Sequence, residues 1–110
     1  MGETKEELLT TIMSLIVQSG NAKSDAMEAI QEAKQKHFDE ARQKIESAEK
    51  HIVDAHGAQT ALLTQEASGD NVEVTLLLVH AQDHLMTSIS FIDLAKEIID
   101  LYSVCYADPK

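Results

Sequence analysis

Apolar and small residues recur at every third or fourth position through most of the chain, a spacing typical of helices that pack along one face. The three series run from Leu8 to Ala33, from Phe38 to Leu62 and from Val74 to Tyr102. Each series is long enough for a helix of several turns. The spacing therefore predicts three helices, at approximately residues 4–35, 38–67 and 71–104.

The clearest break in the chain lies between the second and third series. Gly69 is followed by Asp70 and Asn71, which is typical of a glycine that ends one helix and an N-cap residue that begins the next. Residues 72–79 are rich in Val and Thr, a composition that also fits a strand. A lone strand would have no partner, and the helical spacing continues through this segment, so we expect a helix.

The third predicted helix carries a second stripe on another face. Its members are Val72, Leu76, Val79, Asp83, Met86 and Ser90. One stripe is enough to pack a helix inside a three-helix protomer, and the second would stay exposed to water. The pattern therefore predicts an all-α, antiparallel three-helix bundle whose third helix also packs against copies of itself. The alternative is that this helix is buried on both faces within one chain.

The length and composition fit one domain spanning residues 1–110. A chain of 110 residues can bury one core and is too short for two ordinary domains. The single proline is Pro109 and the four glycines are far apart, so little turn chemistry interrupts the predicted helices. Cys105 is the only cysteine, which excludes an internal disulfide and a zinc site built from thiolates.

The net charge of -10 argues against two classes of partner. Nucleic acids are bound through Lys and Arg, which replace counterions along the phosphate backbone, and acidic membrane surfaces are disfavoured for the same reason. No segment approaches the roughly 20 unbroken apolar residues of a membrane span. The first residues do not form a secretory signal. We therefore expect a cytoplasmic protein without membrane insertion.

Three ionisable residues, His80, Asp83 and His84, lie beside the second stripe. At about 100° per residue, the two histidines lie one turn apart on nearly the same face, and Asp83 is about 60° away from His80. Asp83 interrupts a line of Val, Leu and Met. A buried carboxylate there would be costly unless it is paired or bound to a cation, so we expect a metal or a hydrogen-bond partner for Asp83.

The two histidines allow three interpretations. They fit half of a zinc site, although Ala81 replaces the glutamate that follows the first histidine in a metalloprotease helix. They also fit a purely structural pair on a helix surface. Finally, the His80 imidazole can accept and release a phosphoryl group, with polar side chains nearby at Gln82, His84 and Thr87. No glycine-rich phosphate loop is present, so the phosphate would come from another protein.

Four segments together resemble the lactose/cellobiose (also N,N'-diacetylchitobiose) enzyme IIA family of the phosphotransferase system. They are Val79–Ser88 (VHAQDHLMTS), Asp54–Thr60 (DAHGAQT), Glu66–Gly69 (EASG) and Gln18–Ser24 (QSGNAKS). The resemblance covers about residues 6 to 102. The string from His80 to Met86 is far more specific than a pair of histidines alone.

The resemblance implies a fold, a reaction and two kinds of site. It implies a homotrimer with the third helices around its axis, in which Asp83 from three copies holds a magnesium ion. It implies that His80 becomes phosphorylated by the phosphocarrier HPr and passes the phosphate to the IIB component, coupled to uptake of a disaccharide. Gln82 and His84 match family positions, and we expect them to support the phosphohistidine because they lie close by.

Two other functions stay open at this point. One is a non-catalytic helical oligomer that binds a metal through Asp83, and the other is a structural adaptor in which His80 has no chemical role. His56 matches the family, and we expect it to pack or to form a hydrogen bond between helices. His37 and His51 lie in no motif. The segment from Ser103 to Lys110 departs from the basic C-terminus expected in this family.

Overall fold

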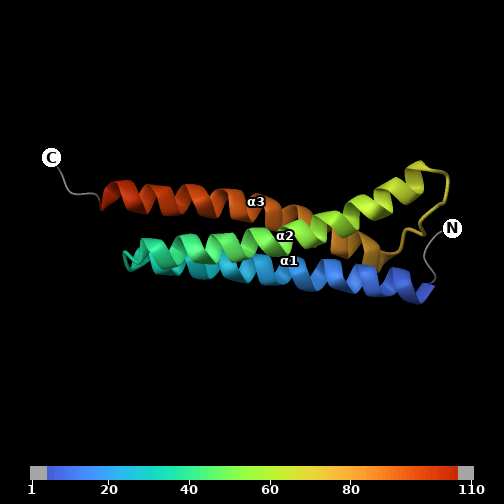
Figure 1. The fold of residues 1–110 in the computed structure, drawn as a ribbon, viewed down its shortest axis with the longest axis horizontal. Coiled ribbons are helices and arrows are strands. Elements are labelled where there is room, and N and C mark those ends of the chain that lie inside the picture. The colour runs from blue at the N-terminus through green and yellow to red at the C-terminus, as the bar shows by residue number, and fades with distance from the viewer. Residues whose placement is uncertain (1–4, 107–110) are drawn as a thin grey trace.

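Three helices form an up-down-up bundle in the computed structural model, which describes residues 5–106 (Figure 1). The helices are α1 (Lys5–Lys34), α2 (Phe38–Ala67) and α3 (Leu76–Cys105). Each helix runs antiparallel to the one before it, so α1 and α3 point in the same direction. The described residues contain no strand, which confirms the predicted all-α three-helix protomer. Residue 4 and the tail from residue 107 lie outside the described part.

The predicted apolar series form the core. Every predicted position of α1 from Ile12 to Ala33 is buried, and every predicted position of α2 from Phe38 to Leu62 is buried or half-buried. In α3 the predicted positions from Leu78 to Ile99 are buried as well. Val74 is the exception. It lies before α3 and is 71% exposed, so the third series begins later than the spacing predicted.

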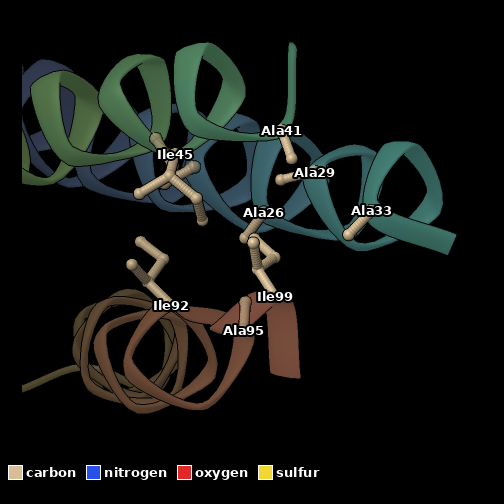
Figure 2. Packing of buried hydrophobic residues seen from close by; sticks show 10 residues of the cluster. Ala26, Ala29, Ala33, Ala41, Ile45, Ile92, Ala95 and Ile99 are labelled. Atoms are coloured by element: carbon tan, nitrogen blue, oxygen red, sulfur yellow. The ribbon is translucent and has the colours of Figure 1, made fainter. Parts of the chain in front are cut away.

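One half of the core is built mainly from alanine. Figure 2 shows Ala26 and Ala29 of α1 and Ala41 of α2 facing a space that Ile92 and Ile99 of α3 enter. The three alanines are fully buried. Because alanine adds little volume, the helix backbones approach closely and the isoleucines fill the remaining space. The fit therefore depends on small residues at these positions.

A pair of buried serines joins α1 to α3 near the middle of the bundle. The Ser88 hydroxyl donates a hydrogen bond to the main-chain oxygen of Ser19 over 3.0 Å, and both residues are fully buried. Such a bond fixes how far α3 is shifted along α1. It lies about two turns beyond His80 along α3.

The connection between α2 and α3 corrects the predicted start of the third helix. Gly69 ends α2 with a φ of 95°, as its position in the sequence predicted. The N-cap of α3, however, is Thr75, whose hydroxyl accepts a hydrogen bond from the main-chain N–H of Leu78 over 3.1 Å. The prediction of an N-cap at Asp70 or Asn71 and a helix from residue 71 is therefore wrong.

The physical reason for this correction is the burial of Val72. Its side chain is only 8% exposed and packs in the same cluster as Leu62 of α2 and Leu78 of α3. The chain crosses from α2 to α3 in a non-helical segment that turns Val72 into the core. Val72 therefore belongs to the core and not to the second stripe.

Ion pairs link the helices on the outer surface. Lys44 of α2 pairs with Glu28 of α1 at 2.7 Å, and Lys96 of α3 pairs with Glu49 of α2 at 3.0 Å. The hydrogen bond to Glu49, followed by its negative charge, raises the pKa of Lys96 above the ordinary value. Exposed pairs of this kind contribute little to stability. The fold therefore depends mainly on the core.

The C-terminal end of α3 lies against the turn between α1 and α2. The rings of Tyr102 and Tyr106 stack with their centroids 6.2 Å apart, and the Lys36 ammonium lies 4.5 Å from the centre of the Tyr106 ring. A cation over an aromatic face is attracted to it. Tyr106, which belongs to the atypical C-terminal segment, is thus held against Lys36. No helix among residues 5–106 is long and apolar enough to cross a membrane.

We predict that Ala26→Leu lowers the free energy of unfolding by about 1–3 kcal/mol, because the larger side chain overfills the contact between the helices. Urea denaturation followed by circular dichroism measures this. Met27→Leu is the control, because Met27 is 44% exposed and its replacement should change stability by less than about 0.5 kcal/mol. Equal stability of the two variants would contradict the close packing described above.

Candidate functional site

His80 and His84 lie side by side on α3. Their Nε2 atoms are 3.1 Å apart, and their rings meet edge to face with centroids 4.4 Å apart. In such a contact one of these nitrogens donates its proton and the other accepts it. His80 is exposed and His84 is half-buried. A second protein can therefore reach the His80 imidazole while His84 holds it from one side.

His80 lies close to the N-terminal end of α3. It lies in the second turn of the helix, five residues after the N-cap Thr75. The first turn, Leu76–Val79, contains no acidic residue although the chain as a whole is acidic. The positive end of the helix dipole stabilises anions near the N-terminus. This effect fades beyond the first turn, and along α3 the acidic residue nearest to His80 is Asp83, about one turn further on.

Gln82 lies on the other side of α3 from His80. Two residues correspond to about 200° around a helix, so the two side chains point in nearly opposite directions. The Gln82 side-chain oxygen accepts a hydrogen bond of 2.5 Å from the side-chain nitrogen of Gln59 in α2. The structure thus brings His84 next to His80, and it holds Gln82 against α2 instead. Thr87 lies about two turns beyond His80 on nearly the same face, and its hydroxyl donates to the main-chain oxygen of Asp83.

Gln59 is a residue whose role the sequence analysis missed. It is a polar residue at a core position of α2 and is only 9% exposed. The signal was present in the sequence, because Gln59 occupies one of the stripe positions that are otherwise apolar or small. Its partner on α3 became visible only in the folded structure.

Asp83 faces solvent in the single chain, among exposed apolar residues. Leu76 is 86% exposed, Val79 51% and Met86 52%, so the second stripe beyond Val72 does lie on the surface. Asp83 is exposed as well. Among the described residues, no group of three or more His, Cys, Asp or Glu side chains could hold a metal ion within one chain. A cation at Asp83 would need carboxylates from several copies.

Apolar side chains of α1 are also exposed in its N-terminal half. Leu9 is 50% exposed and Met13 is 45% exposed. Leu9 and Leu77 line a shallow groove of about 390 Å³, and the charged side chains of Lys5, Glu6 and Glu73 line it as well. The candidate site is therefore an exposed imidazole beside a half-buried one on α3, a helix that also exposes apolar side chains.

The remaining histidines lie elsewhere. His51 Nδ1 is 2.6 Å from the side-chain oxygen of Gln18, which joins α2 to α1. His37 pairs with Glu32 at 2.9 Å near the turn between these helices. His56 is exposed and forms no hydrogen bond within residues 5–106, so neither of the two roles expected for it is observed.

Comparison with known proteins identifies the family. The family model for the lactose/cellobiose-specific IIA subunit of the phosphotransferase system matches residues 10–103. The lichenan-specific phosphotransferase enzyme IIA component of Bacillus subtilis is 47% identical over 97 residues, which is 88% of each chain. The N,N'-diacetylchitobiose-specific EIIA component of Escherichia coli is 41% identical over 97 residues, covering 88% of this chain and 84% of that protein.

Solved structures agree with this assignment. The cellobiose-specific enzyme IIA of Bacillus anthracis superposes with a TM-score of 0.89 at 44% identity, covering 98% of this chain and 97% of that one. The IIA(Chitobiose) protein of Escherichia coli, solved in complex with HPr, superposes with a TM-score of 0.81 at 39% identity, covering 92% of this chain and 98% of that one. The chain therefore belongs to the lactose/cellobiose-specific IIA family of the phosphotransferase system.

Proposed function

We propose that this protein is a cytoplasmic phosphoryl carrier. It accepts a phosphoryl group from phospho-HPr on His80 and passes it to the IIB component, for coupled uptake and phosphorylation of a β-disaccharide such as cellobiose, chitobiose or lactose. The observation that supports this most directly is the exposed His80 imidazole with its Nε2 atom 3.1 Å from His84 Nε2. The family and the solved complex of a relative with HPr support the choice of partner.

The transfer step requires a free electron pair on the attacking nitrogen. His80 Nε2 provides it when the His80 proton is on Nδ1 and His84 Nε2–H donates towards it. A bond then forms between Nε2 and phosphorus while the bond from phosphorus to the donor protein breaks. Because the phosphoryl group now occupies His80 Nε2, the His84 N–H loses this acceptor and can donate to a phosphoryl oxygen instead. Delivery to the IIB component reverses these steps.

The second stripe of α3 supports assembly as a homotrimer. Its exposed apolar residues continue beyond Ser90 at Leu94 and Leu101, both 63% exposed. Packing three copies of this stripe around an axis would remove it from water. Three Asp83 carboxylates would then approach one another in a dry environment, where they need a counter-charge. Magnesium fits this need because it prefers oxygen ligands, and it would stabilise the assembly.

The trimer also gives Gln82 a function. If Asp83 points towards the axis, His80 and Gln82 lie on opposite sides of the part of α3 that faces the axis. In a ring of three copies, the side of one α3 that carries Gln82 then faces the side of the next α3 that carries His80. Gln82 is then in position to donate to a phosphoryl group on another protomer. His84, by contrast, supports the His80 of its own chain.

We predict that incubation with phosphoenolpyruvate, enzyme I and HPr adds one acid-labile phosphoryl group of about 80 Da to the protein and none to His80→Ala. Intact-mass spectrometry measures the gain. Phospho-HPr formed in the same reaction shows that the upstream proteins are active. An unchanged mass in both proteins would refute the relay and favour a non-catalytic, metal-binding oligomer.

We predict that His84→Ala slows phosphorylation by HPr about tenfold to a hundredfold, because the phosphoryl group loses a hydrogen-bond donor. His84→Gln keeps an N–H donor on a flexible side chain and should recover part of the rate. Rapid-quench kinetics measures both. His56→Ala is the matched control, since His56 is exposed and forms no hydrogen bond within residues 5–106. Equal rates for His84→Ala and the parent would rule out this role.

We predict that Asp83→Leu gives a trimer at least as stable as the parent and independent of magnesium, because the variant has no buried charge to compensate. Sedimentation equilibrium with and without a chelator measures the oligomeric state. The parent should dissociate more readily when the chelator is present. Dissociation of Asp83→Leu to monomers would count against packing along the second stripe.

A further inference from the structure

The buried amide of Gln59 needs hydrogen bonds that its neighbours on α2 cannot supply. The next stripe positions along the helix are Ala55 and Leu62, and both are buried. Burying a primary amide is costly unless it is hydrogen-bonded. The bonds of Gln59 instead reach across to α3, where its Nε2 atom lies 2.5 Å from Gln82 Oε1 and 3.8 Å from the sulfur of Met86.

The sulfur of Met86 determines the orientation of both amides. A thioether carries no hydrogen and can only accept. The Gln59 atom that faces this sulfur is therefore the NH2 group, because an oxygen there would meet a second acceptor. The same NH2 group donates to Gln82, so the Gln82 atom directed at α2 is its oxygen. The amide nitrogen of Gln82 then lies at the opposite edge.

In this orientation the NH2 group of Gln82 points away from α2, and its side-chain oxygen points towards Gln59. Gln82 is half-buried on α3, and its NH2 group has no hydrogen-bond partner within residues 5–106. A phosphoryl dianion offers only acceptor oxygens. An outward NH2 group binds such a group, whereas an outward carbonyl oxygen repels it.

We infer that Gln59 is a positioning residue, which holds the Gln82 side chain with its NH2 group outward to bind the phosphoryl group of a phosphohistidine. This inference rests on the proposed function. It explains why a polar residue occupies a core position of α2. Gln59 touches neither histidine and acts only through Gln82.

The experiment reverses the hydrogen bond. Gln59→Glu has the same shape and, at a pH where the new carboxylate is ionised, only acceptor oxygens. Gln82 must then turn its NH2 group inward and its oxygen outward. We expect phosphorylation by HPr to slow at least about tenfold, the effect of losing a hydrogen bond to a charged group. Gln59→Leu frees the Gln82 amide without reversing it and should slow the reaction about threefold. Gln43→Glu makes the same exchange at an exposed position of α2 about 24 Å away and should keep the parent rate.

Two readouts separate positioning from a structural role. The side-chain NH2 signal of Gln82 in NMR spectra should shift when the parent is phosphorylated and should not shift in Gln59→Glu. On a Gln82→Leu background, Gln59→Glu should cause no further loss of rate, because the group through which Gln59 acts is already absent. A further loss of rate in the double variant would overturn the inference.

The outcomes also separate this inference from the proposed function. If the parent is not phosphorylated, the proposed function fails. If the parent is phosphorylated and Gln59→Glu reacts at the parent rate, only the positioning role fails. If Gln59→Glu does not fold, as judged by circular dichroism, Gln59→Leu decides instead. In that variant, a parent-like rate together with a Gln82 NH2 signal that still shifts on phosphorylation as in the parent would overturn the inference.

Discussion

The site depends on the fact that α3 has two apolar faces. One face, from Leu78 to Ile99, is buried against α1 and α2, while a second apolar face is exposed. The two flanks between these faces are the only parts of the helix where polar side chains can lie close to both the core and the solvent. His80 and His84 occupy one flank, and Gln82 occupies the other.

The bundle holds these flanks in place through close packing of small residues. The alanines of α1 let the neighbouring helices approach, and the bond from Ser88 to the Ser19 main chain fixes the shift of α3 along α1. A helix held in this way presents its side chains without much rearrangement. This suits the relay proposed above, in which two different proteins would have to bind the same imidazole in the same orientation.

The proposed chemistry needs few groups besides the imidazole itself. A neutral imidazole needs no metal or nucleotide to accept a phosphoryl group, only donors that meet the incoming charge. In the proposed relay, His84 supplies one such donor within the chain. Gln59 and Gln82 show how a polar contact in the core can prepare a donor at the surface. The first turn of α3 contains no acidic residue, and the acidic residue nearest to His80 along the helix is Asp83.

The sequence by itself determined the three helices, their buried faces and the pairing of His80 with His84, because these follow from the periodicity of a helix within one segment. It did not determine where α3 begins. Val72 has helical spacing, but its side chain is buried against Leu62 and Leu78. This burial keeps residues 70–75 out of the helix, and α3 begins only after its N-cap, Thr75.

The contact between Gln59 and Gln82 was likewise decided only by the tertiary structure. The two residues are 23 positions apart, and no local periodicity relates a position on α2 to one on α3. Their distance depends on how the helices cross and on the shift that packing sets between them. The sequence identified Gln59 as a polar residue in an apolar stripe, and only the packed bundle gave it a partner.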